Sequence, residues 1–305
     1  MSRPKEPRRP APPPGLLIVD KPAGMTSHDV VARARRIMGT RKVGHAGTLD
    51  PMATGVLVLG IERATKLLGH LALDRKTYLA TLSLGRSTTT DDAEGEPLEN
   101  DAAPETLAAV TDEQIADGVA QLTGDIQQVP SAVSAVKIDG KRAYARVRAG
   151  EDVVLPPRPV TVHRFDVLGL RREDDRIELD AVVECSSGTY VRALARDLGA
   201  GLGVGGHLKA LRRTTVGPFT LARARTLDQL EEKPELSLDL DAAVAAAFPR
   251  RDLDAATAKA VQYGRRIPAA GIAGTYGLFA PDGHVLALAS DAEGVTRSVV
   301  VLLPA

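Results

Sequence analysis

The chain has 305 residues, of which 44% are hydrophobic and 26% charged, and its formal net charge is zero, as is ordinary for a globular chain longer than one average domain. A single cysteine, Cys185, excludes an internal disulfide framework and a cysteine-rich zinc site, and the six histidines show no metal-ligand spacing. No apolar run approaches the roughly 20 residues of a membrane span or forms the core of a signal peptide, so we expect a cytoplasmic protein.

The N-terminal region begins with a polar tail and continues into regular structure. Residues 1–14 hold six prolines and no apolar run, which predicts a disordered tail. Residues 16–19 are typical of a short strand and precede the turn KPAG. Thr26 then begins a segment that predicts a helix over residues 28–38, because its apolar residues recur on one face and leave three arginines largely on the other.

The next elements alternate between strands and loops. A long loop over residues 41–51 leads into a strand at 56–60, and a second strand covers residues 78–84. The acidic residues 87–109 are typical of a surface loop. Thr111 with Gln114 forms a capping-box pattern for a helix that ends at Gly124.

The second half of the main body is richer in strands. Residues 139–140 are the Asp-Gly pair of a hairpin turn. Apolar alternation predicts strands over residues 160–170 and 177–185, and a helix follows from Gly188 to Leu198. Long antiparallel strands with interspersed helices indicate an α+β fold rather than repeated βαβ units.

A boundary is predicted near residue 250. A helix over about 254–263 follows it, and then come three strand-like segments, at residues 276–280, 284–290 and 297–303. Pro281-Asp282-Gly283 supplies a turn between the first two strands. These features predict a small β-rich C-terminal domain.

Charge is unevenly distributed although it sums to zero. Residues 87–136 hold eleven carboxylates and no lysine or arginine, whereas residues 30–48 and 198–227 hold basic residues and no carboxylate. A phosphate backbone responds to the local field and not to the sum over the chain. The pattern fits a nucleic-acid partner, although ordinary solvated faces would also produce it.

The segment most informative about chemistry is GHAGTLDPMATG, which places Asp50 among three glycines and a proline. Such a loop can approach a ligand closely. An aspartate before proline is, however, most often a turn residue, because its side chain bonds readily to the nearby backbone. Spacing alone therefore leaves both interpretations of Asp50 open.

Six blocks of the sequence decide between them. VGHAGTLDPMATGVL resembles the signature of the bacterial tRNA pseudouridine-55 synthases of the TruB family, and five further blocks resemble that family in its order. They are LLIVDKPAGMTSHDVV, KTYLATLSLGRSTTTDDAEG, VPSAVSAVKIDGKRAYARVRAGE, CSSGTYVRALARDLG and GGHLKALRRTTVGPF. The resemblance covers about residues 15–225. It implies the pseudouridine synthase fold, with a mixed, mainly antiparallel sheet and helices packed around it.

The resemblance also implies the catalytic residues. Asp50 falls on the catalytic aspartate, and a carboxylate next to the ribose can attack C1′ or take the C2′ proton without a cofactor or metal. Arg192 falls on the arginine that pairs with this carboxylate and would orient it. Tyr78 falls on the tyrosine that stacks on the target base. Without the motif, Arg192 would be interpreted as a solvated helix arginine and Tyr78 as a core strand aromatic.

Substrate contacts follow from the same resemblance. The target uridine lies in a folded T loop and has to be flipped out, and His45 falls on the residue that fills the vacated space. Lys21 and Leu211 fall on further positions of the active-site wall. Because RNA phosphates are gripped by lysine and arginine, we nominate five backbone contacts: Arg41, Lys42, Lys209, Arg212 and Arg213.

The predicted organisation is a tail over residues 1–14, a catalytic domain over 15–250 and a PUA-like RNA-binding domain over 251–305. Residues 251–305 resemble the C-terminal domain of actinobacterial members of the family. Alternatively, this domain only stabilises the protein and does not bind RNA. The expected partner is the T arm of tRNA, with no membrane, no required protein partner and a monomeric state. An alternative function is a tRNA-folding RNA chaperone for which catalysis is secondary. An unrelated small-molecule enzyme finds no motif here, since neither a phosphate-cradling GxxxxGK nor a GxSxG element occurs.

Overall fold

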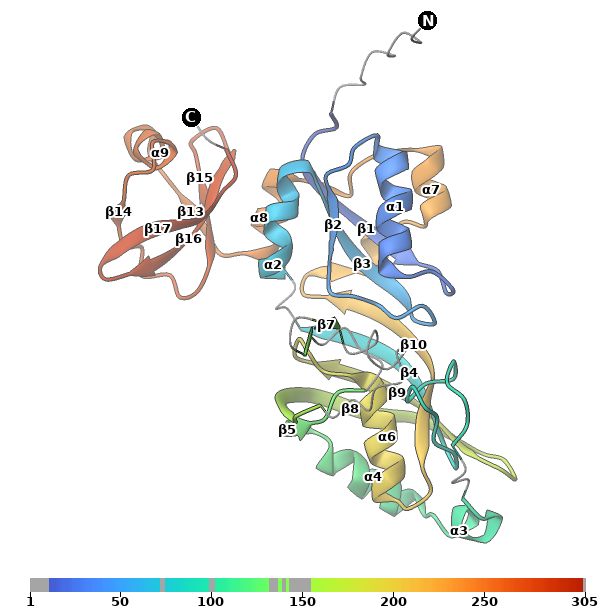
Figure 1. Ribbon diagram of the computed structural model, residues 1–305. Coiled ribbons are helices and arrows are strands. Elements are labelled where there is room, and N and C mark those ends of the chain that lie inside the picture. Colours follow the sequence, from blue (N-terminus) through green and yellow to red (C-terminus); the bar gives the residue numbers. More distant parts are fainter. Residues whose placement is uncertain are drawn as a thin grey trace, which may run out of the picture. The chain divides into compact units, whose positions relative to one another are not determined.

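The computed structural model describes residues 11–71, 75–98, 102–131, 137–138, 141–142 and 155–303. The chain divides into two compact units: unit 1 comprises residues 1–51, 55–72 and 217–305, and unit 2 comprises residues 52–54 and 73–216. Both units combine helices with mainly antiparallel sheets (Figure 1), which confirms the predicted α+β class. None of the helices in the described part is both long and apolar enough to cross a bilayer.

Unit 1 contains an antiparallel sheet in the order β12-β1-β3-β2. Its strands are β1 (Gly15–Lys21), β2 (Val43–Ala46), β3 (Thr54–Ile61) and β12 (Leu238–Asp239). β1 and β3 are buried along almost their whole length, which explains why both consist of nearly continuous apolar residues. The short elements around them are α1 (Ser27–Met38), η1 (Glu62–Leu67), α2 (Leu68–Leu71), β11 (Phe219–Thr220), η2 (Leu221–Arg223), α7 (Leu227–Glu232) and α8 (Leu240–Ala247).

Helix α1 forms where the sequence predicts it. Thr26 is the N-cap, and it forms a capping box with Asp29, in which each side chain bonds the backbone of the other residue. Gly39 ends the helix with a φ of 65°, which glycine adopts without steric cost. The helix buries Val30, Val31 and Ala34, so its apolar face is the one predicted from periodicity.

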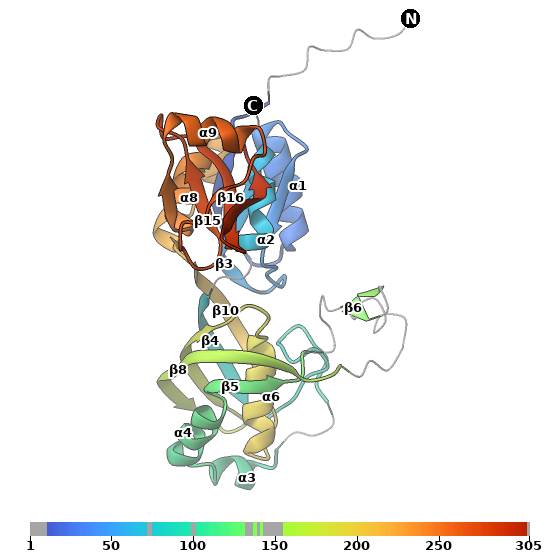
Figure 2. The ribbon, with the colours of Figure 1, turned by 90° about the vertical axis from the view of Figure 1, so that its left-hand side faces the viewer.

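The C-terminal residues of unit 1 form a second sheet in the order β13-β15-β16-β17-β14. The strands are β13 (Arg250–Asp252), β14 (Ile267–Pro268), β15 (Tyr276–Phe279), β16 (Val285–Ala292) and β17 (Val295–Val301). Helix α9 (Ala255–Gln262) packs on this sheet (Figure 2) and shares a buried core with it, to which Val261, Tyr276 and Leu286 contribute. The predicted helix and all three predicted strands are confirmed within two residues.

Unit 2 is built on an antiparallel sheet in the order β10-β4-β9-β8-β5. The strands are β4 (Lys76–Leu84), β5 (Gly124–Gln128), β8 (Arg158–Arg172), β9 (Ile177–Cys185) and β10 (Gly206–Val216). The helices are α3 (Pro104–Ala108), α4 (Asp112–Gln121) and α6 (Val191–Gly201), of which α6 packs on β4 and β10. β9 has the predicted bounds because Leu179, Ala181 and Val183 are buried on one face and alternate with less buried residues.

Several details differ from the sequence predictions. The loop predicted over residues 41–51 contains β2, whose residues pair with β3. The helix predicted from Gly188 begins at Val191, because Gly188 has a φ of 91° and residues 186–189 form a turn. Helix α4 ends at Gln121, since Gly124 opens β5. β10, α7 and α8 were not predicted, and α3 lies within residues 87–109, which were predicted to be a surface loop. The predicted hairpin turn at 139–140 lies outside the described residues; its flanks, β6 (Lys137–Ile138) and β7 (Lys141–Arg142), pair antiparallel.

Candidate active site

The loop that carries Asp50 joins β2 to β3 in unit 1. Asp50 is half-buried, and the residue before it, Leu49, is buried. The Ser27 hydroxyl accepts a hydrogen bond from Leu49 N (2.9 Å) and donates one to Leu49 O (3.0 Å). Gly47 has a φ of 71°, a conformation that glycine adopts readily. Helix α1, through Ser27, therefore fixes the backbone directly before Asp50.

Lys21, at the end of β1, fixes the other side of the same loop. Its ammonium is fully buried and donates to the carbonyl oxygens of Pro51 (3.1 Å), Pro22 (2.8 Å) and Met25 (2.6 Å). Gly24 N also donates to Pro51 O, at 2.9 Å. An ammonium offers three donors, and three carbonyls accept from it here. Lys21 thus ties the KPAG turn to the residue after Asp50, so the structure brings these two predicted site residues close together.

The other predicted residues of unit 1 lie on or beside β2. His45 is half-buried on β2 opposite Leu59, and its ring meets that of His28 edge-on, with centroids 5.4 Å apart. Arg41 and Lys42 are exposed just before β2. Lys42 Nζ lies 3.3 Å from Glu62 Oε2, but its side chain is 75% exposed, so this pair leaves the ammonium in contact with solvent.

Arg192 lies in the first turn of α6 in unit 2, where it is buried. Its Nη1 donates to Thr90 O at 2.8 Å and lies 3.3 Å from Asp92 Oδ2. Both side chains of this ion pair are 5% exposed. A buried guanidinium surrounded by oxygen acceptors is held in one orientation, since losing a partner would leave a charge in a medium of low dielectric constant.

Asp91 and Asp92 were missed by the sequence analysis, which placed them in a surface loop. Asp92 accepts from Thr90 Oγ1 (2.5 Å) and Glu94 N (3.1 Å), which fixes its carboxylate. Asp91 pairs with Arg196 at 3.0 Å. Two adjacent carboxylates thus meet two arginines four residues apart on α6. The spacing of two arginines, four residues apart on one helix, was the available signal.

Tyr78 and Leu211 lie on neighbouring strands of unit 2. Tyr78 is 7% exposed on β4, with Val183 of β9 on one side and Arg213 of β10 on the other. Leu211 is opposite Ala80 and lines a hollow of about 390 Å³. Tyr78, Leu211 and Arg213 are therefore neighbours, brought together by the pairing of β4 with β10.

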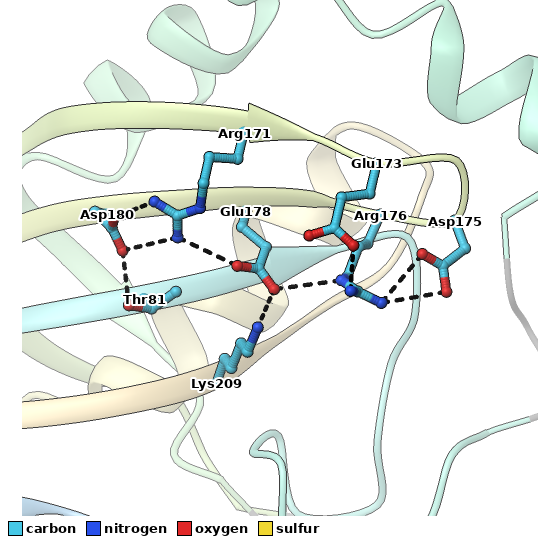
Figure 3. Close-up of polar contacts among 8 residues, drawn as sticks. All are labelled: Thr81, Arg171, Glu173, Asp175, Arg176, Glu178, Asp180 and Lys209. Carbon is cyan, nitrogen blue, oxygen red and sulfur yellow. Dashed lines mark hydrogen bonds and ion pairs between the residues drawn. The ribbon is translucent and has the colours of Figure 1, made fainter.

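The three nominated cations of β10 have different surroundings. Lys209 pairs with Glu178, which Arg171 and Arg176 also contact at 3.2 and 3.3 Å (Figure 3). The Lys209 ammonium is the largest cause that holds the pKa of Glu178 below its ordinary value. Arg212 Nη1 donates to Thr54 Oγ1 at 3.3 Å. Arg213 is fully buried. Arg213 is therefore enclosed, a position that does not favour a contact with phosphate, whereas the side chain of Lys209 is paired with Glu178 and still 47% exposed.

The predicted catalytic residues come from both units: Asp50 from unit 1, and Tyr78 and Arg192 from unit 2. Each unit orders its own side chains by local contacts. The pairing of Arg192 with Asp50 stays a prediction, and within unit 2 Arg192 contacts the carboxylate of Asp92.

Comparisons with family models match most of the chain. The model described as TruB family pseudouridylate synthase (N terminal domain) matches residues 35–191. The model of the tRNA pseudouridylate synthase B C-terminal domain matches residues 192–244, and that of tRNA pseudouridine synthase II, C terminal, matches residues 248–303.

Individual relatives agree with the family models. The chain is 61% identical over 292 residues to the tRNA pseudouridine synthase B of Rhodococcus jostii, covering 95% of this chain and 94% of the relative. It is 62% identical over 290 residues to that of Nocardia farcinica, with the same two coverages. Among solved structures, a Cbf5-Nop10-Gar1 complex matches with a TM-score of 0.69 and 26% identity, covering 95% of this chain and 85% of that one. The match confirms the predicted pseudouridine synthase fold.

Proposed function

Because the chain belongs to the TruB family of pseudouridylate synthases, we propose that it isomerises the uridine at position 55 in the T loop of tRNA, with Asp50 as the catalytic carboxylate. The observation that carries the proposal is the rigid support of Asp50. Ser27 holds the residue before it, and Lys21 holds the residue after it. Such support keeps a reacting group in its productive position.

The reaction breaks the N1–C1′ bond of uridine, turns the uracil and forms a C5–C1′ bond, after which C5 loses its proton and N1 gains one. An ionised Asp50 either attacks C1′ or removes the C2′ proton, and both routes return the carboxylate unchanged. All atoms of the base and ribose are retained, apart from the exchanged protons. The chemistry thus needs a positioned carboxylate and a base that can be turned.

Arg192 is proposed to orient Asp50. Its contacts with Asp92 and Thr90 O are made by Nη1. A guanidinium has five N–H donors in a rigid plane, so one edge can be held by unit 2 while another binds the catalytic carboxylate. Asp92 is then a positioning residue that acts through Arg192.

The target uridine is proposed to be flipped out of the T loop, with His45 filling the vacated space. Tyr78 would stack on the flipped base, and Lys21 and Leu211 would form the wall around it. Arg41, Lys42 and Arg212 are the nominated phosphate contacts that the structure favours. Arg213 is better explained as a structural cation because it is buried, whereas Lys209 is paired with Glu178 but keeps a 47% exposed side chain and stays a nominated contact.

The organisation is proposed to be a tail at residues 1–14, a catalytic domain at 15–250 and an RNA-binding domain at 251–305. Support for the last comes from the separate sheet of β13 to β17. The protein is proposed to act as a cytoplasmic monomer on the T arm of tRNA without a protein partner. The alternative of a tRNA-folding chaperone is not favoured, since the curated relatives described above are named as synthases.

The testing experiment is tritium release from a T-arm RNA labelled at uracil C5, because C5 gives up its hydrogen only when the new bond forms. We expect release by the wild type and a loss of at least about 10⁴-fold in the Asp50→Asn variant. RNA binding should be nearly unchanged. Turnover of the variant at close to the wild-type rate would disprove the assignment of Asp50, and tRNA folding without release by either protein would favour the chaperone alternative.

A further inference from the structure

An aromatic side chain and three cations gather at the C-terminal end of α9. Tyr263 is 66% exposed, the highest value among the exposed large hydrophobic side chains of the described residues. Lys259 lies one helical turn before it, and Arg265 and Arg266 follow it; all three are exposed. We call Lys259, Tyr263, Arg265 and Arg266 the α9 patch.

The backbone at this end of the helix directs the patch outward. Gly264 has a φ of 73°, and its N–H donates to Val261 O, while Arg265 N donates to Ala260 O, both at 2.9 Å. These are the two bonds of a Schellman motif, in which the residue after the glycine commonly makes an apolar contact with the last helical turn. Here that residue is an exposed arginine. The apolar side of the helix, with Ala258 and Val261, packs on the sheet.

The charges of the patch are not neutralised by neighbours. Elsewhere in this sheet Arg250 pairs with Asp252 at 2.7 Å, and Arg297 pairs with Glu293. Across the described residues, by contrast, no carboxylate pairs with a side chain of the patch. Asp254, the nearest carboxylate in α9, caps the opposite end of the helix.

Cations at a helix C-terminus also interact favourably with the helix dipole, and this effect alone would explain Lys259. It does not explain an exposed tyrosine between them, since exposing an aromatic ring to water gains nothing for the fold. A tyrosine flanked by unpaired cations suits a ligand with flat rings and regularly spaced negative charges. Single-stranded nucleic acid combines both, because bases stack on aromatic rings while phosphates bind lysine and arginine.

We infer that the α9 patch is a second RNA-binding surface, on which an unpaired nucleotide stacks on Tyr263 while its flanking phosphates contact Lys259, Arg265 and Arg266. It lies outside the proposed catalytic residues and contributes affinity rather than chemistry. The inference deepens the proposed function: it names the residues through which the proposed RNA-binding domain at 251–305 contacts RNA, and it takes tRNA as the RNA that the protein meets.

Fluorescence tests the stacking directly, because the sequence contains no tryptophan. The Tyr263→Trp variant has a single reporter in the patch, and Val299→Trp is the matched control, since Val299 is 47% exposed on β17 of the same sheet. On titration with full-length tRNA we expect quenching of the first variant and little change in the second. An absence of quenching in Tyr263→Trp, or equal quenching in both, would overturn the inference.

Binding and turnover provide an independent readout. Tyr263→Ala should raise the Kd for tRNA about 5- to 20-fold. Arg265→Ser/Arg266→Ser should lower the slope of log Kd against log salt by about 1.4, the value for two lost single-strand phosphate contacts. Both should keep the wild-type rate of tritium release at saturating RNA.

The control Arg164→Ser/Lys233→Ser removes the same charge from surface ion pairs with Asp166 and Glu235, and it should leave both Kd and slope unchanged. Thermal unfolding by circular dichroism checks that all variants fold. An unchanged Kd and slope in the patch variants would refute the RNA surface and leave a role in helix stability. A wild type that binds tRNA with quenching but releases no tritium would instead refute the proposed function alone.

Discussion

Arg192 is a buried cation that contacts the carboxylate of Asp92 and the carbonyl of Thr90. These two acceptors belong to one short turn, which is attached to β10 by hydrogen bonds between Leu208 and the backbone of residues 91 and 93. The orientation of the arginine therefore depends on a loop far from it in sequence. If Arg192 acts in catalysis, the position of its guanidinium depends on the geometry of that loop.

Replacing Asp92 tests this dependence at the scale of one residue. Asp92→Asn keeps the size and one oxygen acceptor but removes the charge that pairs with Arg192. We expect a rate of tritium release at least about tenfold lower, and a free energy of unfolding lower by about 1–3 kcal/mol, as for hydrogen bonds to charged groups. Single-turnover assays and urea denaturation measure the two quantities.

Asp91→Asn is the matched control, because Asp91 pairs with Arg196 instead and has a φ of 60°, which asparagine tolerates. It should lose some stability and keep the wild-type rate. Equal loss of rate in both variants would show that the loop acts through its general stability and not through Arg192.

At the scale of the elements, one carboxylate, that of Asp291, connects several segments of the C-terminal sheet by hydrogen bonds. Asp291 accepts from Tyr276 Oη at 2.5 Å and Thr296 Oγ1 at 2.7 Å, and from the N–H groups of Ala270 and Gly271. These bonds, of which that from Tyr276 is the strongest cause, lower the pKa of Asp291 from 3.8 to about 2. Four donors from three segments thus meet on one side chain.

The lowered pKa determines how this sheet responds to acid. A carboxylate with a folded pKa below its unfolded value adds stability above pH 3.8, and this contribution is lost as pH falls towards 2. We expect the Asp291→Asn variant to be less stable than the wild type at pH 6 and to approach it at pH 2.5. Urea midpoints at the two pH values measure this. Asp166→Asn, at the exposed ion pair with Arg164, is the control for removal of a surface carboxylate, and a difference for Asp291→Asn that stays constant with pH would contradict the argument.

At the scale of unit 1, the C-terminal sheet is attached to the rest of the unit by a few polar contacts. His284 Nδ1 contacts Asp241 Oδ2 at 2.8 Å, and Val285 N donates to Asp241 Oδ1 at 2.6 Å. Lys66 Nζ and Arg63 Nη1 donate to the carbonyls of Val301 and Leu302. The sheet is therefore joined to α8 by a contact between a histidine and a carboxylate, and to η1 by contacts between cationic side chains and backbone carbonyls.

The contact between His284 and Asp241 predicts a pH dependence of stability opposite to that of Asp291. Asp241 is the first cause that raises the pKa of His284, and Asp282 and Asp239 add to it. A histidine with a raised folded pKa adds stability below its ordinary pKa of 6.5, which is lost as pH rises through the folded value. We expect His284→Gln to lower the unfolding midpoint at pH 5.5 more than at pH 8.5. His163→Gln, at an exposed position of β8, is the control, and equal losses at both pH values would rule out the titrating contact.

In the whole molecule, several charges of the acidic and basic segments form ion pairs with residues from other parts of the fold. In the acidic segment, Asp91 and Asp92 meet arginines of α6, and Asp112 meets Arg172 of β8. Among the basic segments, Arg33 pairs with Asp228 and Glu231, as in a surface cluster. Much of the apparent segregation is thus neutralised within the fold, and the cations that remain available, such as those of the α9 patch, are better candidates for RNA contacts.

The sequence by itself determined what depends on neighbouring residues. The cap of α1 at Thr26, the cap of α4 at Thr111 and the alternation of β9 all follow from interactions within a few positions. The family signature likewise predicts Asp50 as the catalytic residue, because the signature is one short segment of the sequence. These features could be predicted before any contact between distant segments was known.

Only the tertiary structure decided what depends on distant residues. β2 is a strand because β3 lies beside it, Arg213 is buried because β10 pairs with β4, and Arg192 is held by a turn about 100 positions earlier in the chain. Burial and pairing of this kind are set by packing between segments, on which local propensity has little influence. For this reason the nominated cations could be ranked for RNA contact only after the fold showed which of them are already paired or enclosed.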